Sequence, residues 1–489
     1  MIVRRPKKVL FYPLHETSII KFLKVIDADK EGKLDVIFLL TGLRLLKYIP
    51  VLLERDIQVW RIELGAKSYR QIVSVEESEM QATDSIGLNR DSTLKVNVDS
   101  SSWFRVFIEH FPVLVRFKKG IYFLRKSRVE IRWLLKKYKV ITQLVNTISP
   151  EVVVLCGDRH LQYEPALIRV CSEQRIPMKI PPVSISPTPN QLVGYRASKG
   201  SGAFVSDAVS RRFRGSKQFR DYRGQGYVSY YEPWQMEALR HCNMLTNNPW
   251  VIGGSGKVTV MAPGHELSSK IEAEGVPKDK IVMTGDPDYD DVFTSLRHRS
   301  RRRSDFLENK VFEADRLFLG LSLPQYLEHK LSDDKTHWSY IHRLCELYCD
   351  TGQNVCLSLH PKMDPEKYSY LEQKYNLVIV RAPLRNWIGA LDIFSASCGS
   401  STLSWSSRIG IPTIAFDWLQ WRLGYSDIYT SAELVETPDE YEKVLTRLVS
   451  DNGYASKLGG VLAKLSVMDQ GGCTGKVDSS KAIISELLR

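Results

Sequence analysis

The chain has 489 residues, of which 43% are hydrophobic and 25% are charged, and its formal net charge is +12. These proportions are those of ordinary globular proteins, and they exclude a disordered, collagen-like or solenoid chain. The length exceeds that of one usual domain, so we expect two domains, each large enough to bury its own core.

The apolar segments are interrupted too early for a membrane span. The best candidate, residues 35–53, contains Arg44 and Lys47, whereas a span needs roughly 20 mostly apolar residues. The first residues are cationic and run directly into a strand-like segment at 9–12. They lack the longer apolar core and the small-residue cleavage site of a signal peptide. We therefore expect a cytoplasmic protein.

Positive charge is concentrated in four clusters, at residues 4–8, 116–139, 211–223 and 297–303. Such clusters are either solvated faces or contacts for phosphorylated substrates and anionic lipid headgroups. The chain contains no RNP, KH, C2H2 or basic-zipper pattern. We therefore expect no nucleic-acid partner.

The sequence lacks the common metal and cofactor motifs. Its eight cysteines include no C-x-x-C pair, which favours buried free thiols over a zinc site or a disulfide framework. There is also no Walker A loop and no G-x-G-x-x-G fingerprint. An ATPase or a dehydrogenase is therefore not indicated.

The first part of the chain alternates between strand and helix patterns, which predicts a parallel, doubly wound sheet. The expected strands are residues 8–12, 35–40, 57–62, 152–156, 176–183, 258–261 and 281–284. The expected helices are residues 17–28, 43–55, 165–173 and 265–274. Residues 67–148 interrupt this order with a polar stretch and then a basic helical stretch, so we interpret them as an insertion.

A second α/β lobe is expected to follow a linker near the charge run 297–304, which has no apolar anchor. Its expected strands are residues 317–321, 355–359, 378–380, 393–396 and 413–416, and its expected helices are residues 338–348 and 402–409. The predicted division is a lobe at residues 1–300 for the acceptor and a lobe at residues 305–489 for the nucleotide donor.

His360-Pro361 follows the expected strand 355–359 directly. Ligand contacts in such sheets lie beyond the carboxyl ends of the strands. Proline after the histidine favours an extended backbone, which directs the ring out of the sheet. An imidazole there can donate a hydrogen bond to a phosphate. Alone, the dipeptide is also compatible with a structural turn.

Gly399, Ser400, Ser401 and Thr402 connect another strand to the start of a helix. Free backbone N–H groups and the positive end of the helix dipole form an anion site at such a position. One hydroxyl suffices to cap a helix, so a glycine with several hydroxyls exceeds what capping requires. Asp417 ends the next strand, where it either holds a donor hydroxyl or is an ordinary loop aspartate.

These elements, in this order, resemble the C-terminal lobe of GT-B-fold transferases that build bacterial capsule and lipopolysaccharide from CMP-activated acidic sugars, and of related CDP-glycerol-type polymerases. In those families an HP motif and a paired-serine motif bind the nucleotide phosphates, which corresponds here to His360-Pro361 and Ser400-Ser401. Residues 275–287 resemble the "GVP-x-x-KI-x-x-TG-x-P" crossing of such enzymes and of UDP-sugar 2-epimerases. The resemblance covers about residues 255–425. It implies two Rossmann-like lobes with the active site in the cleft between them.

Two residues at strand ends are candidates for the catalytic base. In the CMP-sugar families an acidic motif of the first lobe deprotonates the acceptor hydroxyl, and Asp158 stands at a suitable strand end. The doubled acidic residue and the glycine of that motif are missing here. His15 follows the first strand, as the base does in some other GT-B enzymes. Alternatively, either side chain caps the helix that follows it, or Asp158 pairs with Arg159.

Residues and resemblance together indicate a glycosyltransferase that moves a sugar from a CMP-, CDP- or UDP-linked donor to a hydroxyl of a surface glycan or a lipid-linked acceptor. His360, Ser400 and Ser401 would hold the phosphate as the nucleotide leaves, and Asp158 or His15 would take the acceptor proton. The alternatives are a nucleotide-sugar 2-epimerase, a CDP-polyol phosphotransferase and a non-catalytic glycan-assembly partner.

The same interpretation sets expectations for cofactors and location. GT-B enzymes generally stabilise the departing nucleotide without a metal, and the nucleotide sugar is a substrate, so we expect neither a metal nor a cofactor. Lipid-linked glycans grow at the inner membrane face. We therefore expect peripheral contact with an anionic membrane surface there.

Overall fold

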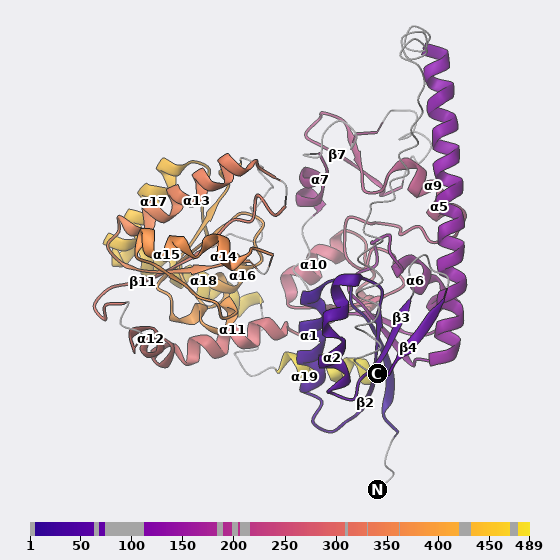
Figure 1. Ribbon diagram of the computed structural model, residues 1–489, viewed down its shortest axis with the longest axis horizontal. Helices are drawn as coiled ribbons and strands as arrows, with labels where there is room; N and C mark the ends of the chain where they lie inside the picture. The colour runs from indigo at the N-terminus through magenta and orange to yellow at the C-terminus, as the bar shows by residue number, and fades with distance from the viewer. Residues whose placement is uncertain are drawn as a thin grey trace.

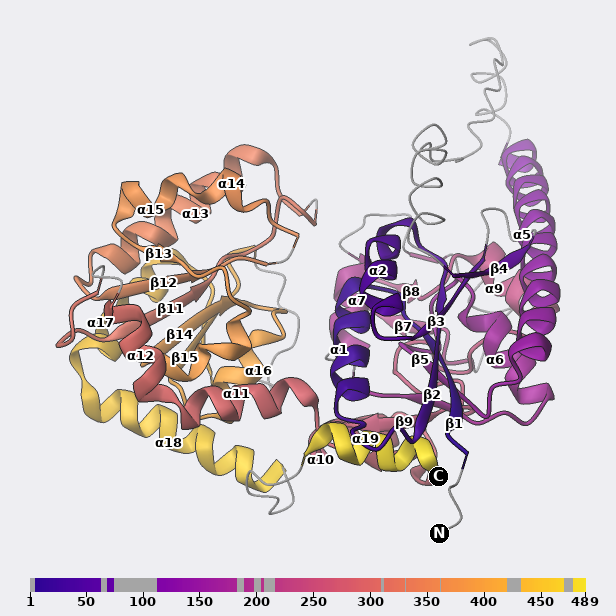
Figure 2. The same ribbon diagram turned by 60° about the horizontal axis from the view of Figure 1, so that its bottom comes forward.

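The computed structural model describes residues 5–62, 68–73, 112–182, 189–197, 204–205, 216–308, 312–329, 331–360, 362–419, 432–469 and 478–489. Within these ranges the protein has two α/β lobes, each built around its own sheet (Figure 1). The first strand, residues 7–12, and the last helix, residues 479–488, both lie at the first lobe (Figure 2). The described part of residues 67–148 consists of a short strand and one long helix.

The first lobe contains an eight-stranded sheet in the order β10-β9-β6-β5-β1-β2-β3-β4. All neighbouring strands pair in parallel except β3 and β4, which are antiparallel. The strands are β1 (Lys7–Tyr12), β2 (Leu34–Leu40), β3 (Gln58–Ile62), β4 (Tyr69–Ile72), β5 (Val152–Leu155), β6 (Met178–Ile180), β9 (Thr259–Ala262) and β10 (Ile281–Met283). A separate hairpin joins β7 (Phe219–Asp221) to β8 (Tyr227–Ser229).

The helices of the first lobe are α1 (Glu16–Asp27), η1 (Leu43–Tyr48), α2 (Ile49–Leu53), α5 (Pro112–Ile148), α6 (Glu164–Glu173), α7 (Pro189–Ala197), α9 (Pro233–His241), α10 (His265–Ala273) and η3 (Lys278–Lys280). Most of them bury apolar side chains in the core of this lobe. The exceptions are α7, which packs on β8, and η3, which has no buried residue. The central strands β1 and β5 are apolar over almost their full length because both faces of the sheet are covered. The long helix α5 lies at the outer edge of this lobe (Figure 1).

The second lobe contains a six-stranded parallel sheet in the order β13-β12-β11-β14-β15-β16. Its strands are β11 (Phe318–Ser322), β12 (Asn354–Ser358), β13 (Val378–Ile379), β14 (Ile393–Ser397), β15 (Thr413–Phe416) and β16 (Ala432–Val435). Its helices are α12 (Arg299–Glu308), α13 (Asp334–Cys349), α14 (Pro365–Tyr368), α15 (Tyr370–Tyr375), η4 (Leu384–Asn386), η5 (Ile388–Ala390), α16 (Thr402–Arg408), α17 (Pro438–Ser450) and α18 (Asn452–Asp469). Two apolar clusters, one on each side of the sheet, form its core.

The basic run 297–304, near which the sequence predicts the linker, is helical and contacts the second lobe. It forms most of α12, where the guanidinium of Arg299 donates to the carbonyls of Gly389 and Leu391. Arg299 and Arg303 also pair with Asp392. The sequence argument noted the missing apolar anchor, but here the cations themselves attach the helix through hydrogen bonds.

The crossing between the lobes runs through α11 (Pro287–Arg297) and returns through α19 (Ser479–Leu488). Three residues of α19, Ile483, Ile484 and Leu487, belong to the apolar core of the first lobe. The predicted division assigned this helix to the second lobe with the rest of residues 305–489. Figure 2 shows α19 lying under the first lobe, after α18 has run along the second.

Two further expectations concern cysteines and membrane spans. None of the seven described cysteines forms a disulfide. Six of them are buried, which confirms the prediction of buried thiols for these six, and Cys349 is half-buried. Burial raises the pKa of Cys156 to about 12. In the described ranges, no helix combines the length and the apolar sequence that crossing a membrane requires.

Candidate functional site

Each sheet has one point where the chain reverses its direction of winding. In the first sheet, β1 pairs on one side with β2 and on the other with β5, and later strands extend outward from each. In the second sheet, β11 has the same position between β12 and β14. Ligands of open α/β sheets bind beyond the carboxyl ends of the strands at such points. The candidate site is therefore built from the loops that follow these strands.

In the first lobe, the loops after β1 and β5 bring His15 and His160 together. Their ring centroids are 6.2 Å apart, with the rings edge to face. His15 is exposed just before α1, and its backbone N–H donates to the Ser18 hydroxyl at 3.1 Å. Desolvation by the surrounding protein and the positive charges of His160 and Lys362 lower the pKa of His15. His15 is therefore a neutral imidazole at physiological pH.

His160 is held by the carboxylate of Glu164, in the first turn of α6. The Oε2 atom of Glu164 lies 2.9 Å from His160 Nδ1 and also accepts the backbone N–H of His160 at 2.8 Å. Glu164 is fully buried, whereas the His160 side chain is 39% exposed. The sequence analysis gave neither residue a role. The i,i+4 spacing of a histidine and a glutamate at a strand end was the available signal.

Asp158 points away from this pair, into the interior. Its residue surface is only 1% exposed. Its two carboxylate oxygens accept backbone N–H groups, one from Gly253 at 3.1 Å and one from Ser255 at 2.7 Å. Burial raises the pKa of Asp158. This geometry makes Asp158 the anchor of the glycine-rich turn at residues 248–256.

In the second lobe, His360 follows β12 as predicted and is half-buried. Its Nδ1 accepts the backbone N–H of Lys362 at 3.1 Å, so in the neutral ring the proton is on Nε2. Burial, Lys362 and His329 lower the pKa of His360 to about 4. His360 therefore offers a neutral N–H donor. Pro361 lies outside the described residues.

The loop after β14 contains Gly399, Ser400, Ser401 and Thr402. Gly399 has a φ of +86°, a left-handed conformation that favours glycine. The hydroxyls of Ser400 and Thr402 are 2.8 Å apart and bonded to each other. Ser401 is exposed, and its side chain makes no capping hydrogen bond to α16. Its hydroxyl is thus not used as a helix cap.

Asp417 follows β15 and is 3% exposed. Its negative charge raises the pKa of Tyr326, a buried residue that follows β11, although burial is the larger cause. Asp417 therefore lies within electrostatic reach of the loop at the switch point. Almost none of the surface of Asp417 is accessible to solvent.

Lys362 connects the two lobes electrostatically. Its exposed ammonium lowers the pKa of His360 and His329 on its own lobe and that of His15 on the other. Electrostatic effects of this kind fall off over about 8 Å at physiological ionic strength. The two switch points therefore face each other across this positive charge.

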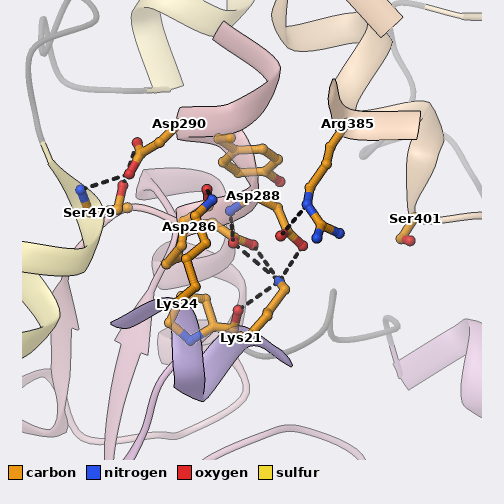
Figure 3. A network of polar contacts seen from close by, with 12 residues as sticks. Lys21, Lys24, Asp286, Asp288, Asp290, Arg385, Ser401 and Ser479 are labelled. Carbon is orange, nitrogen blue, oxygen red and sulfur yellow. Dashed lines mark hydrogen bonds and ion pairs between the residues drawn. The ribbon is translucent and has the colours of Figure 1, made fainter. Parts of the chain in front are cut away.

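A buried ion network fixes the crossing helix α11 to the first lobe (Figure 3). The ammonium of Lys21, on α1, lies 3.1 Å from Asp286 and 2.9 Å from Asp288. Burial lowers the pKa of Lys21, but the two carboxylates more than reverse this, so the net pKa is above its ordinary value. The guanidinium of Arg385, on η4, pairs with Asp291 at 3.1 Å.

The same helix also contacts α19, through which the chain returns to the first lobe, and α16, which follows the predicted phosphate loop. Asp290 accepts the backbone N–H and the hydroxyl of Ser479, the first residue of α19. The hydroxyl of Tyr289 bonds that of Ser404 on α16, and the guanidinium of Arg408 lies 4.2 Å from the Tyr289 ring centroid. α11 therefore joins both lobes to the helix that follows Gly399–Thr402.

Among the residues that the structure describes, no three His, Cys, Asp or Glu side chains gather in a way that could hold a metal ion. The acidic side chains of the crossing are instead paired with Lys21, Lys24 and Arg385.

No family model matches the chain, and no curated protein matches its sequence. Solved structures do match. LpCGTa in complex with UDP has a TM-score of 0.50 at 11% identity, covering 99% of both chains. UDP-GlcNAc 2-epimerase from Neisseria meningitidis, bound to UDP-GlcNAc, has a TM-score of 0.49 at 12% identity, covering 99% of this chain and 100% of that chain. A glycosyltransferase from Rickettsia africae has a TM-score of 0.49 at 11% identity, covering 99% and 98%.

At such identities the likeness concerns the fold. Two Rossmann-like lobes with parallel sheets, joined by a double crossing, form the GT-B fold. The fold class predicted from the sequence is confirmed.

Proposed function

We propose that this protein is a glycosyltransferase that transfers a sugar from a nucleotide-activated donor to a hydroxyl of a surface glycan or of a lipid-linked acceptor. The observation that carries the proposal is the position of Lys362, whose charge reaches histidines of both lobes. A nucleotide diphosphate is an anion, and it fits a positive centre between two switch points. Its sugar would then lie beside His15 and His160.

Three groups of the second lobe suit the leaving nucleotide. Lys362 supplies a positive charge. His360 supplies a neutral hydrogen-bond donor, its Nε2–H group. The loop at residues 399–401 supplies hydroxyl groups and backbone N–H donors. Fixed donors of this kind stabilise negative charge as it develops on a departing phosphate. In this proposal the nucleotide is CMP, CDP or UDP, and Thr402 belongs to the loop that contacts its phosphates.

The first test is nucleotide binding. Thermal shift is measured against CMP, CDP and UDP for the wild type, for K362A and for the control K367A, which removes an equally exposed lysine of the same region. We expect stabilisation by one of the three nucleotides. Loss of a charge-assisted contact of about 1.5–3 kcal/mol should weaken its binding roughly 10- to 100-fold in K362A and leave it unchanged in K367A.

The outcomes separate the candidate functions. Stabilisation by none of the three nucleotides would favour a non-catalytic glycan-assembly partner and contradict the proposal. Conversion of UDP-N-acetylglucosamine to its 2-epimer without any acceptor would indicate an epimerase. Release of a polyol phosphate from its CDP ester would indicate a CDP-polyol phosphotransferase.

We also propose that the outer face of α5 contacts an anionic membrane surface at the cytoplasmic side. Four exposed cations, Arg125, Arg128, Arg132 and Lys136, follow a helical spacing of three or four residues and so share one face. Exposed apolar side chains flank them, namely Ile121, Tyr122, Leu124, Val129, Trp133 and Leu135. Cations between aromatic and aliphatic side chains match anionic headgroups above acyl chains.

Vesicle sedimentation tests this surface. We expect the protein to bind phosphatidylglycerol-rich vesicles and not phosphatidylcholine vesicles, and to be released by high salt. R128E/R132E should abolish the binding, whereas K335E/K367E, which reverses the same charge on exposed lysines of the second lobe, should not. Equal loss in both double variants would mean that net charge alone, and not the α5 face, attracts the protein.

A further inference from the structure

We propose that His160, held by Glu164, is the general base that takes the proton of the acceptor hydroxyl. This inference rests on the proposed function and deepens it on the acceptor side. The sequence argument gave this role to Asp158 or His15. The geometry of the first lobe favours a different residue of the same loop.

The hydrogen bonds of the two lobes select opposite tautomers for their histidines. An ionised carboxylate only accepts, so the 2.9 Å contact with Glu164 puts the proton of His160 on Nδ1 and leaves a lone pair on Nε2. His360 accepts a backbone N–H at Nδ1 and therefore carries its proton on Nε2. One ring is arranged to receive a proton, and the other to donate a hydrogen bond.

Glu164 can stabilise the positive charge that His160 would acquire. It is fully buried, and its Oε1 has no hydrogen-bond partner among the described residues. A buried carboxylate with one unsatisfied oxygen is unfavourable unless a cation compensates it. An imidazolium at His160, formed when the acceptor loses its proton, is a cation in contact with that carboxylate.

The loop before α6 fits His160 closely. A Cβ at Gly157 would lie 3.1 Å from Cε1 of the His160 ring. Glycine at this position therefore lets the ring lie against the backbone, in the orientation that meets Glu164. The ring remains 39% exposed, so a substrate hydroxyl has access to it.

The other ionisable groups near this pair are less suited to the task. The charge of Glu164 acts on Tyr12 from β1, on Cys156 and Asp158 after β5, on His15 before α1, and on Tyr230 and Tyr231 from the hairpin side. Burial raises the pKa of Tyr12 and Cys156, so both stay protonated at neutral pH. Asp158 has both oxygens occupied. His15 faces Lys362, which disfavours a second positive charge.

The proposed step is a single displacement. The acceptor oxygen forms a bond to the anomeric carbon of the donor sugar while its proton moves to Nε2 of His160. The bond between the anomeric carbon and the phosphate oxygen breaks, and its electron pair leaves with the nucleotide beside Lys362 and His360. A displacement of this kind inverts the anomeric configuration.

The tautomers provide a test that needs no substrate. In ¹⁵N-histidine-labelled protein at pH 7.5, two-bond ¹H–¹⁵N spectra distinguish Nδ1–H from Nε2–H rings, and H160N and H360N assign the two signals. We expect Nδ1–H for His160 and Nε2–H for His360. An Nε2–H or doubly protonated His160 would overturn the proposal, whichever nucleotide binds.

The kinetic test measures nucleotide release from UDP-N-acetylglucosamine and CMP-N-acetylneuraminate, with bacterial membranes as acceptor. For the donor that is used, H160A should lower kcat roughly 100- to 10,000-fold, the usual contribution of a general base. Its thermal shift by the free nucleotide should match that of the wild type and of H241A, which removes an exposed histidine. Wild-type turnover by H160A would refute the assignment, whereas failure of the nucleotide shift in every variant would refute the proposed function instead.

Glu164 acts through His160 and is a positioning residue. E164Q removes the negative charge beside the imidazolium that forms during proton transfer, so it should lower kcat and leave KM near the wild-type value. E164D should restore part of kcat. A raised KM with an unchanged kcat would show that Glu164 only supports the shape of the site.

Discussion

Asp158 shows how a single side chain at a strand end can be structural although its position suits catalysis. Its oxygens accept the Gly253 and Ser255 N–H groups, so D158N would turn an amide NH₂ toward one of these donors. An unsatisfied buried donor costs about 1–3 kcal/mol. We expect D158N to lose that much unfolding free energy in urea titrations while the folded fraction keeps most of its turnover.

The control for this variant is D279N, which changes an exposed aspartate in the same lobe and should leave both quantities unchanged. Full stability with lost turnover in D158N would assign the proton transfer to Asp158 after all. The His160 assignment would then be wrong.

The lowered pKa of His360 leads to a prediction about the pH dependence of stability. Its native pKa is about 4, whereas an unfolded histidine titrates near about 6.5. Between these values the unfolded chain binds a proton that the native state does not, so stability falls as the pH falls. H360Q removes this group and should flatten the pH dependence of urea midpoints measured between pH 7 and 4.5. H241Q should keep the wild-type slope, and an equal slope in H360Q would contradict the pKa shift.

At the scale of elements, most strands follow from hydrophobic runs, and β15 has the bounds that the sequence predicts. The edge strand β4 was missed because its antiparallel partner β3 supplies its hydrogen bonds, and a polar four-residue segment carries no local signal of that. Helix α12 was missed because its anchors are carbonyls of η5, which only the tertiary structure brings near. The sequence analysis did not identify His160 and Glu164 for a similar reason. The turn between β5 and α6 brings the imidazole and the carboxylate into contact.

The helix α19 tests how strongly the last residues hold the first lobe. Leu487 is fully buried in that lobe's core, and the neighbouring Glu486 pairs with Lys179 at 2.8 Å. Large-to-small changes at such sites cost about 2–5 kcal/mol. We expect L487A to lower unfolding free energy by this amount in urea titrations. L434A, at an exposed position, should change it by less than about 0.5 kcal/mol. Equal effects would mean that α19 does not stay docked.

At the scale of the whole molecule, the two lobes depend on the ion network around α11. The Lys21 side chain is 13% exposed, and those of Asp286 and Asp288 are 4% and 8% exposed. The Lys24–Asp291 pair on the same two helices is more exposed, at 28% and 31%. The two lysines therefore form a matched pair, one buried and one nearer to solvent.

K21M should be the more damaging of the two changes because it leaves two buried carboxylates without their main counter-charge. Breaking such a contact costs about 3–5 kcal/mol, whereas K24M should cost under about 1 kcal/mol. Burial raises the pKa of Asp286 and Lys21 opposes this, so without Lys21 the pKa of Asp286 rises further. A raised native pKa makes stability increase as the pH falls. The deficit of K21M relative to the wild type should therefore shrink between pH 7 and pH 5 in urea titrations. A deficit that is constant with pH would show that lost packing, and not the uncompensated charge, destabilises the crossing.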